Sequence, residues 1–487
     1  MTLDSQLDTI RSSPKGPGTA AFFDFDGTII SGYSASALYS HRFKSREIGP
    51  AEALHAVKAT LSGPLSEDQF VELITMGISG WAGRPEAEIE ELGEQLFRRE
   101  IAGNLFHETW RLIKAHQRRG HTVVIATSAT RFQAAPLARE LEIEHVICTE
   151  LEVQHGLMTG KLAGRTLWGP GKIAGVQAFA ELEGIDLAQA FGYANGNEDV
   201  PFLDAIGNPC AINPQPVLAK VAKRQDWPVL EFAKRPGKFD PKPVVRTAAI
   251  YGTIVGAGAA GMVIGAFSRN RRRGIDLATS IVGQVGGALA NVEVKATGER
   301  HLWSQRPAVF MINHQSSLID LLVTTTLLRG GFTAIAKQEA AGIPVIGQLL
   351  TMADFAFIDR ASNNQAKAAL AQALDRLKDG ASIVISPEGT RSYTPAIGQF
   401  KKGGFHLAMQ AGVPIVPIVI RNAGELMSRS AKTARPGVVE VIVLEPIPTD
   451  GWTKADLDRA VVQLQQLYRD TLENWPVRGP AALEASK

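Results

Sequence analysis

The sequence predicts an α/β protein with two α/β domains on either side of an apolar segment. Short apolar runs alternate with helical stretches from about residue 20 to 214, and the same alternation resumes from about 291 to 475. Between these regions, the 22 residues from 247 to 268 carry no charged side chain. A chain of 487 residues is long enough for two or three domains.

The composition is that of an ordinary folded protein in a reducing compartment. Lys and Arg number 51 against 49 Asp and Glu, a balance that argues against a dedicated nucleic-acid binder. Charged residues make up 21% and hydrophobic residues 45%, which excludes wholesale disorder and a polytopic transporter. Cys148 and Cys210 are too few for a disulfide framework, and their apolar neighbours predict that both are buried. The first residues contain neither a basic region nor an apolar run, so we expect no signal peptide.

Apolar runs and prolines divide the chain further. Strands are expected at 20–25, 122–126 and 190–194 in the first half, and at 308–312, 355–358, 382–386, 415–420 and 438–444 in the second. The mostly helical sequence between the first two strands suits an inserted cap, and six prolines in 214–246 favour extended chain. The predicted organisation is a first domain at 1–215 with a helical cap at about 31–115, a proline-rich basic linker at 216–246, an apolar anchoring segment at 247–290, a second domain at 291–475 and a tail at 476–487.

The uncharged stretch 247–268 predicts contact with a membrane. As a helix it would be about 33 Å long, which matches a bilayer core. Five glycines place small residues at four-residue spacing, and the run Arg269–Arg273 that follows suits anionic headgroups. The alternative is a buried Gly/Ala-rich helix of the second domain. A single crossing would separate the two domains, so we favour a re-entrant or interfacial anchor on the cytoplasmic face.

Asp24 and Asp26 follow the first strand at positions i and i+2. Past the end of a strand, both carboxylates can converge on one cation. Asp24 would then serve as nucleophile and metal ligand, and Asp26 would protonate the leaving oxygen. A solvated Asp-rich turn is the alternative.

Further polar residues follow in an order that suits phosphoryl transfer. Thr127 and Ser128 end the second strand with hydroxyls and amides that can hold phosphoryl oxygens, and Lys172 can neutralise the charge between nucleophile and phosphate. A surface lysine after a Gly-Pro turn is the plainer interpretation of Lys172. Asn195 and Asp199 follow another strand and offer oxygens that suit Mg²⁺.

Residues 20–215 resemble the haloacid dehalogenase superfamily, in particular its phosphoserine-phosphatase-like branch with a helical cap. The resemblance implies that Asp24 is the phosphorylated nucleophile, Asp26 the general acid and base, and that Mg²⁺ is the cofactor. It assigns Thr127 and Lys172 to the second and third family motifs. The sequence departs at Ala194-Asn195, where the family usually has Gly-Asp, so the site loses one negative charge.

A second candidate site begins with His314 and Asp320, which follow a strand and open an apolar helix. A histidine held by a carboxylate makes an alcohol nucleophilic near neutral pH. No Gly-x-Ser-x-Gly motif accompanies the pair, so direct attack by a substrate hydroxyl is favoured over an acyl-enzyme. A structural helix cap is the alternative interpretation of the pair.

Later segments add groups that suit a phosphate monoester. Arg360 follows one strand, and Lys401 precedes a later helix. The turn after the strand 382–386 supplies exposed amides, a carboxylate and a guanidinium, in the order Glu388, Gly389, Thr390 and Arg391.

Residues 295–450 resemble the glycerolipid acyltransferases, which include 1-acyl-glycerol-3-phosphate acyltransferases. The resemblance implies that His314 is the general base, that Asp320 orients it, and that Arg360, Glu388, Gly389 and Arg391 organise the acceptor phosphate. The family usually has four residues between its histidine and aspartate, whereas this sequence has five. On a regular helix the extra residue would turn Asp320 by about 100°, so either a bulge or another group must orient the histidine.

Together these features predict a membrane-associated bifunctional enzyme of phospholipid synthesis. The second domain would transfer an acyl chain from acyl-CoA or acyl-ACP (acyl carrier protein) to lysophosphatidic acid, and the first would hydrolyse a phosphomonoester with Mg²⁺. The expected partners are lysophosphatidic acid, the acyl thioester donor and the membrane surface, with acyl carrier protein as a further partner if it carries the acyl group. No nucleic acid is expected. Two alternatives stay open: a degenerate regulatory first domain beside the acyltransferase, or a phosphatase with a lipid-binding second domain.

Overall fold

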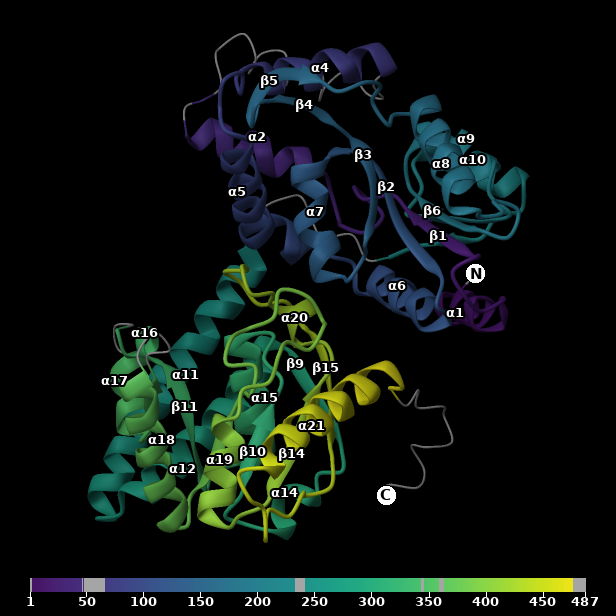
Figure 1. The fold of residues 1–487 in the computed structure, drawn as a ribbon. Coiled ribbons are helices and arrows are strands. Elements are labelled where there is room, and N and C mark those ends of the chain that lie inside the picture. Colours follow the sequence, from purple (N-terminus) through teal and green to yellow (C-terminus); the bar gives the residue numbers. More distant parts are fainter. Residues whose placement is uncertain are drawn as a thin grey trace. The chain divides into compact units, whose positions relative to one another are not determined.

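The computed structural model describes residues 2–45, 47, 66–232, 241–342, 346–358 and 363–475. The chain divides into two compact units, Met1–Gly237 and Lys238–Lys487. Each unit has its own mostly parallel sheet with helices packed on it, as Figure 1 shows. This confirms the predicted pair of α/β domains.

The first unit is built on a six-stranded parallel sheet with the order β3-β2-β1-β6-β7-β8. Strand β1 lies in the middle, and its last residue, Phe23, pairs with Ile125 on one side and Tyr193 on the other. The segments that follow β1, β2 and β6 therefore leave the sheet at the same end, where the carboxyl ends of these parallel strands lie. The strands are β1 Ala20–Phe23, β2 Thr122–Thr130, β3 His145–Thr149, β6 Phe191–Ala194, β7 Asn208–Ile212 and β8 Val229–Leu230, and a separate hairpin pairs β4 Leu151–Gln154 with β5 Leu157–Leu162.

Local sequence signals set the helix ends of the first unit. Ser66 and Gln69 form a capping box at the start of α4, and α8 begins with Pro170, whose missing N–H is not needed there. Gly120 ends α6 in the left-handed conformation, at φ +74°. The helices are α1 Leu3–Ser12, α2 Ser34–Lys44, α4 Glu67–Ser79, α5 Glu86–Leu96, α6 His107–Arg119, α7 Arg131–Glu140, α8 Pro170–Glu183, α9 Val200–Asp204 and α10 Pro216–Arg224, with short η1 Phe97–Ile101, η2 Ala102–Asn104 and η3 Asn197–Asp199.

A buried hydrogen-bond chain ties α1 to the sheet. Gln6 donates to the Tyr193 hydroxyl at 3.2 Å, and that hydroxyl lies 2.9 Å from His116 Nε2. His116 Nδ1 lies 2.8 Å from His121 Nδ1, and His121 Nε2 donates to the Pro14 carbonyl at 2.7 Å. Because a carbonyl only accepts, every link is satisfied when both histidines are neutral. Burial lowers the pKa of both rings, in agreement with this assignment.

The second unit is built on a seven-stranded sheet with the order β12-β11-β13-β10-β14-β15-β9. Among the described strands of this sheet, only the β14–β15 pairing is antiparallel. Side chains of β10 alternate between two cores: Phe310 and Ile312 face one, whereas Val309 and Met311 face the other. The strands are β9 Val292–Thr297, β10 Val309–Ile312, β11 Phe332–Lys337, β12 Ala356–Ile358, β13 Ser382–Ile385, β14 Ile415–Ile420 and β15 Gly437–Val443.

Helices cover both faces of this sheet. Residues of α11 and α15 join the first of the two cores, and residues of α18, α19 and α21 join the second. The helices are α11 Pro241–Phe267, α12 Arg271–Ile281, α13 Gly287–Ala290, α14 His301–Ser304, α15 Ser317–Leu328, α16 Gln338–Ala341, α17 Ile346–Met352, α18 Asn363–Lys378, α19 Gly403–Ala411, α20 Ala423–Leu426 and α21 Asp456–Glu473, with the π-helical η4 at Val282–Gly286.

The predicted extended linker at 216–246 is partly wrong. Residues Pro216–Arg224 form α10, and α11 already begins at Pro241. Proline is well tolerated in the first turn of a helix, so these prolines start helices rather than prevent them. Residues 233–240 and the predicted tail at 476–487 lie outside the described residues.

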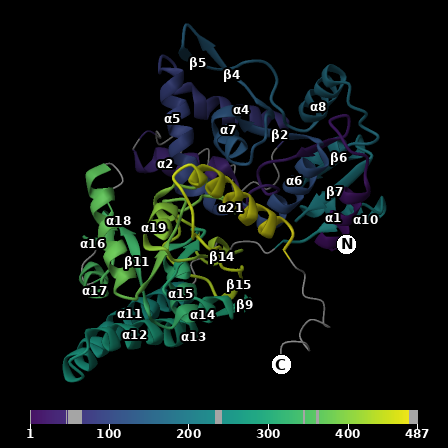
Figure 2. The same ribbon diagram turned by 60° about the horizontal axis from the view of Figure 1, so that its bottom comes forward.

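By length and composition, helix α11 could cross a membrane over Lys242–Phe267, with a mean hydropathy of 1.7, and 17% of its apolar 18-residue window is buried. Figures 1 and 2 show α11 and α12 side by side. Gly261 and Gly274 allow this close approach, because a Cβ on Gly261 would lie 2.5 Å from the Gly274 carbonyl oxygen. Side chains such as Val263 and Phe267 remain exposed, at 53% and 85%.

Candidate active sites

The first candidate site has a buried lysine between two aspartates. Lys172 Nζ lies 2.8 Å from Asp24 Oδ1 and 2.5 Å from Asp199 Oδ1. All three residues are at most 5% exposed. Asp24 follows β1, Lys172 lies in the first turn of α8, and Asp199 ends η3, so three separate segments supply this charge cluster.

Burial controls the charges of this cluster. It raises the pKa of Asp24 to about 6, although the nearby Lys172 opposes the shift. Burial alone would lower the pKa of Lys172, but the charges of Asp199 and Asp24 outweigh it and raise that pKa. The lysine therefore stays protonated and holds the Asp24 carboxylate in place.

Asp26 is held by the first residue of α2. Its Oδ1 accepts from the Ser34 amide at 2.6 Å, and its Oδ2 accepts from the Ser34 hydroxyl at 3.0 Å. Gln133 in turn donates to the Ser34 hydroxyl at 3.0 Å. Burial raises the pKa of Asp26 to about 7, which suits a proton donor near neutral pH. Both oxygens of Asp26 are thus engaged with Ser34 instead of sharing the Asp24–Asp199 cluster.

The last residues of β2 carry the predicted hydroxyls. Thr127 is buried, and its hydroxyl oxygen accepts from the Ala129 amide at 3.0 Å. The Ser128 carbonyl accepts from Thr149 at 2.8 Å, which fixes the backbone there. Thr28, which the sequence analysis did not single out, donates to Asp24 Oδ2 at 3.2 Å.

Asn195 lies directly against the turn that carries the two aspartates. A Cβ on Gly27, whose φ is +79°, would lie 2.1 Å from Asn195 Nδ2, so only glycine fits there. Glu198, also not predicted, approaches Asp199 closely enough that both carboxylates would contact a Cβ on Gly196. Burial, followed by the charge of Asp199, raises the pKa of Glu198 to about 7.

The donor set fits Mg²⁺, although no tight cage is preformed. Among the described residues, no three acidic, histidine or cysteine side chains converge as metal ligands. Carboxylate oxygens of Asp24 and Asp199 and the amide oxygen of Asn195 are nevertheless the hard donors that Mg²⁺ prefers. Burial raises the pKa of both Asp24 and Glu198, and a bound cation would favour the ionised form of each carboxyl.

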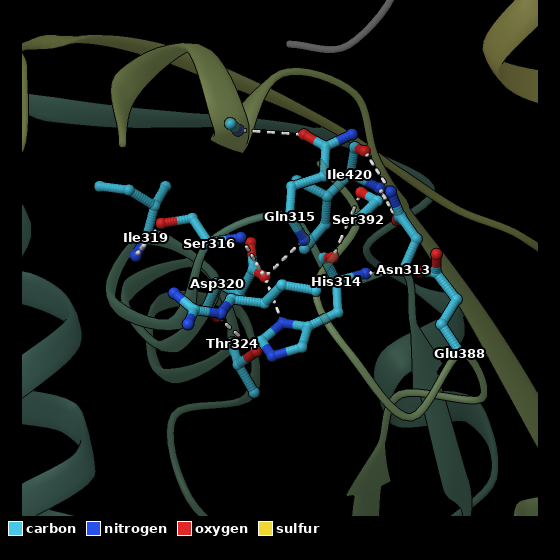
Figure 3. A network of polar contacts seen from close by, with 12 residues as sticks. Asn313, His314, Gln315, Ser316, Ile319, Asp320, Thr324, Glu388, Ser392 and Ile420 are labelled. Atoms are coloured by element: carbon cyan, nitrogen blue, oxygen red, sulfur yellow. Dashed lines mark hydrogen bonds and ion pairs between the residues drawn. The ribbon is translucent and has the colours of Figure 1, made fainter. Parts of the chain in front are cut away.

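The second candidate site centres on His314, shown in Figure 3. His314 Nδ1 lies 2.7 Å from Asp320 Oδ2, and the same oxygen accepts from the amides of Gln315 and Ser316 at 3.1 and 3.0 Å. The Asp320 side chain is 4% exposed and that of His314 24%, so the ring has access to solvent. The carboxylate accepts from Nδ1–H, which leaves Nε2 as the basic nitrogen.

Of the two alternatives for the extra residue, a local departure from the helix is the one that the structure shows. Asp320 would turn away on a regular helix from His314, but α15 begins only at Ser317, with Ser316 as its extended N-cap at φ −142°. The non-helical stretch 314–316 therefore absorbs the extra residue. Asp320 reaches back over the first turn to the ring and to two free amides before the helix.

Glu388 holds the backbone of the histidine segment. Its Oε1 accepts from the His314 amide and its Oε2 from the Gly398 amide, both at 2.8 Å. The side chain is buried, and burial raises its pKa to about 7 despite these hydrogen bonds. In this structure Glu388 therefore contacts the peptide groups that position His314, a role that the sequence motif alone does not distinguish from phosphate binding.

The neighbouring turn brings further predicted residues to His314. Gly389 has φ +70°, and a Cβ there would lie 3.3 Å from Lys401 Nζ. Thr390 is exposed, Arg391 is half-buried, and the amide of Ser392 donates to the His314 carbonyl at 2.8 Å. Arg360 lies outside the described residues.

Two buried residues that the sequence analysis missed support the histidine. Asn313 exchanges two hydrogen bonds of 2.7 Å with the backbone of Ile420, at the end of β14. Tyr468 of α21 donates to the Met311 carbonyl at 2.5 Å and accepts from the Ile418 amide at 3.2 Å. The position of Asn313 directly before the histidine was the available signal, whereas nothing near Tyr468 indicated its role.

Comparisons with known proteins agree with this division. Residues 21–204 match the model of the haloacid dehalogenase-like hydrolases, and residues 293–421 match the acyltransferase model. A Schizosaccharomyces pombe protein described as an uncharacterized acyltransferase is 36% identical over 39% of this chain and 68% of its own length. A Mycobacterium tuberculosis protein named phosphoserine phosphatase is 30% identical over 54% of this chain and 84% of its own length. The chain belongs to both families.

A further relative carries a more specific name. The 1-acyl-sn-glycerol-3-phosphate acyltransferase of Saccharomyces cerevisiae is 32% identical over 38% of this chain and 61% of its own length. The chain thus joins a hydrolase domain to an acyltransferase domain, and each domain matches its relatives separately.

Proposed function

We propose that the acyltransferase domain transfers an acyl chain to the free hydroxyl of lysophosphatidic acid and forms phosphatidic acid. One observation carries this proposal: a partly exposed imidazole is bonded at Nδ1 to a buried carboxylate at 2.7 Å. This arrangement leaves Nε2 basic and oriented, and a phosphate-binding guanidinium, that of Arg391, follows in the turn bonded to the His314 carbonyl.

The proton transfers balance without an acyl-enzyme. Nε2 of His314 accepts the hydroxyl proton while the hydroxyl oxygen attacks the thioester carbonyl carbon. Asp320 stabilises the imidazolium that results. When the carbon–sulfur bond breaks, the thiolate leaves and takes the proton from Nε2, which restores the neutral ring.

The substrates follow from chemistry and from the relatives. The name of the yeast relative supports a lysophosphatidic acid acceptor, and a thioester of coenzyme A or of acyl carrier protein supplies the acyl group. The exposed apolar side chains of α11 support a membrane anchor, as does the basic run Arg271–Arg273 at the start of α12. We place this anchor on the cytoplasmic face, where thioester donors occur.

We propose that the hydrolase domain cleaves a phosphomonoester. A carboxylate oxygen of Asp24 attacks phosphorus, the ester oxygen leaves with the proton of Asp26, and water then hydrolyses the aspartyl phosphate as Asp26 recovers a proton. Asp24, Asp199 and Asn195 would hold Mg²⁺, which supplies neutralising charge for the phosphoryl oxygens. Lys172 keeps Asp24 ionised, and the name of the mycobacterial relative supports phosphoserine as a first substrate to test.

The acyltransferase proposal is tested by measuring phosphatidic acid made from lysophosphatidic acid and acyl-CoA, with acyl-ACP as the second donor. Wild type is expected to form product with at least one donor, and His314→Ala is expected to form none above background. His406→Ala, a change of the same type on α19, is the matched control. Full activity of His314→Ala would show that another group is the base.

The hydrolase proposal is tested with a panel of phosphomonoesters in the presence of Mg²⁺. Wild type is expected to release phosphate and Asp24→Asn to release none. Asn195 supports a second candidate function, a regulatory domain that binds phosphate without hydrolysis, because one charge of the metal site is missing. Mg²⁺ binding without phosphate release across the panel would favour that function.

A further inference from the structure

Two arginines on different loops meet beside His314 in the acyltransferase domain. Arg391 follows the turn that Glu388 holds, and Arg429 lies in the loop between α20 and β15. Arg391 Nη1 donates to the Arg429 carbonyl at 3.1 Å, and Arg429 Nη1 donates to the Arg391 carbonyl. The guanidinium of Arg429 also lies over the ring of Tyr393, 4.0 Å from its centre. The position of Arg429 is thus set by two contacts with the segment 391–393.

This pair of like charges is not bonded to a carboxylate of the described residues. Within the described part of the chain, neither guanidinium forms an ion pair. Burial and then the charge of Arg429 lower the pKa of Arg391, so the two cations repel each other. Asp320 acts on Arg391 through its charge but is bonded to His314. Two half-buried guanidiniums without a counterion favour the binding of an anion between them.

The surroundings place this anion where the acyl acceptor must lie. The amide of Ser392, between Arg391 and Tyr393, donates to the His314 carbonyl at 2.8 Å. The loop that carries Arg429 is tied to α11, because the Ala434 amide donates to the Thr247 hydroxyl at 2.8 Å. The two loops that carry the arginines therefore contact both the segment of the proposed base and the apolar helix from which a lipid would arrive.

We propose that Arg429 is a second phosphate-binding residue, which acts with Arg391 as a two-guanidinium clamp on the phosphomonoester of the acceptor. Each guanidinium has five N–H donors, and the hydrogen bonds to the carbonyls use only Nη1. The remaining donors suit the three oxygens of a terminal phosphate. This inference rests on the proposed acyl transfer to a phosphate-bearing lipid.

Direct binding tests the clamp without depending on turnover. Titration calorimetry of the full chain in detergent is carried out with a water-soluble short-chain lysophosphatidic acid, with coenzyme A and with monoacylglycerol. Arg429→Gln is expected to weaken binding of lysophosphatidic acid by about 10- to 100-fold, because charge-assisted hydrogen bonds are lost. Binding of coenzyme A and of the phosphate-free monoacylglycerol should change less than about twofold.

Lys432→Gln is the matched control, since it removes one exposed positive charge from the same loop. Arg429→Lys keeps the positive charge but loses the planar set of guanidinium N–H donors, and should give an intermediate affinity for lysophosphatidic acid. It also serves as the readout if Arg429→Gln folds poorly, in which case unchanged affinity of Arg429→Lys for lysophosphatidic acid would count against the clamp. Steady-state kinetics should show a raised KM for lysophosphatidic acid with kcat little changed.

Three results would overturn the clamp: unchanged affinity of Arg429→Gln for lysophosphatidic acid, a loss that falls on coenzyme A instead, or no binding of lysophosphatidic acid by wild type. Failure of the proposed reaction looks different. A wild-type protein that binds lysophosphatidic acid through Arg429 but forms no phosphatidic acid would contradict acyl transfer and leave the clamp intact.

Discussion

The two candidate sites handle charge in opposite ways. In the hydrolase domain, the charge of Lys172 offsets part of the charge of Asp24 and Asp199, in a cluster that is at most 5% exposed. In the acyltransferase domain, His314 is partly exposed and Arg391 has no acidic partner among the described residues. The first site carries its own counterion, whereas we propose that the second is completed by the phosphate of its substrate.

The two sites also differ in how the chain assembles them. Asp24 and Lys172 are separated by 148 positions in the sequence. They meet only because the end of β1 and the start of α8 come together in the folded unit. His314 and Asp320 are separated by six positions, and their geometry depends on where one helix begins. Damage to the first site should therefore affect folding as well as activity, and damage to the second mainly activity.

The largest expected effect is a crossed loss of the two activities. Asp24→Asn should lower phosphate release by about 10³-fold or more and leave phosphatidic acid formation within about twofold, and His314→Ala should do the reverse. Both activities are measured on the same preparations of the full chain. A variant that loses both activities would show that the two sites are coupled, which would contradict the expectation that they act separately.

Removal of the buried lysine should destabilise the first unit strongly. Lys172→Met leaves Asp24 and Asp199 buried without their counterion, which costs about 3–5 kcal/mol. The measurement is urea unfolding followed by hydrogen exchange in β1 and β6. Lys161→Met, at an exposed position of β5, should change stability by less than about 0.5 kcal/mol. A small effect of Lys172→Met would mean that the cluster contributes to catalysis alone.

Glu388→Gln tests the second site in the same way as Lys172→Met tests the first. It should affect activity more than folding. The amide keeps one acceptor but turns an NH₂ group toward either the His314 or the Gly398 amide, so one backbone hydrogen bond is lost. We expect a fall in kcat of about 10- to 100-fold from the displaced base. Glu445→Gln, an exposed glutamate of the same unit, is the control. An unchanged kcat would show that Glu388 does not position His314.

The smallest effect concerns the histidine chain under the hydrolase site. The folded state lowers the pKa of His116, so on acidification the unfolded chain takes up this proton first and stability falls. Asp24, Asp26 and Glu198 titrate nearby with the opposite sign, so the difference between wild type and a variant is the useful quantity.

The stability advantage of wild type over His116→Asn should therefore grow by about 1.4 kcal/mol per pH unit from about pH 5 to about 6.5, and stay constant above. Thermal unfolding of the first unit across this range provides the measurement. His145→Asn, on β3, is the control for the loss of a histidine side chain from this unit. A constant difference for His116→Asn would mean that the buried ring is not held neutral.

Much of the fold was predictable because it depends on local patterns. Apolar runs ending in polar residues located β1, β2, β6 and β10, and an uncharged stretch located most of α11. Strands β9 and β11 were not predicted, because polar and charged residues interrupt the apolar runs in their sequences, VEVKAT and FTAIAK. The linker was misjudged because proline prevents a helix interior but starts a helix well.

The sequence by itself determined which chemical groups are present and in what order: two aspartates after a strand, a distant lysine, and a histidine followed by an aspartate. Only the tertiary structure decided what these groups touch. It showed that Asp26 pairs with Ser34, that Glu388 holds the backbone of His314, and that Arg429 meets Arg391. The reason is physical, because burial, pKa and hydrogen-bond partners depend on segments that meet only when the sheets and loops pack together.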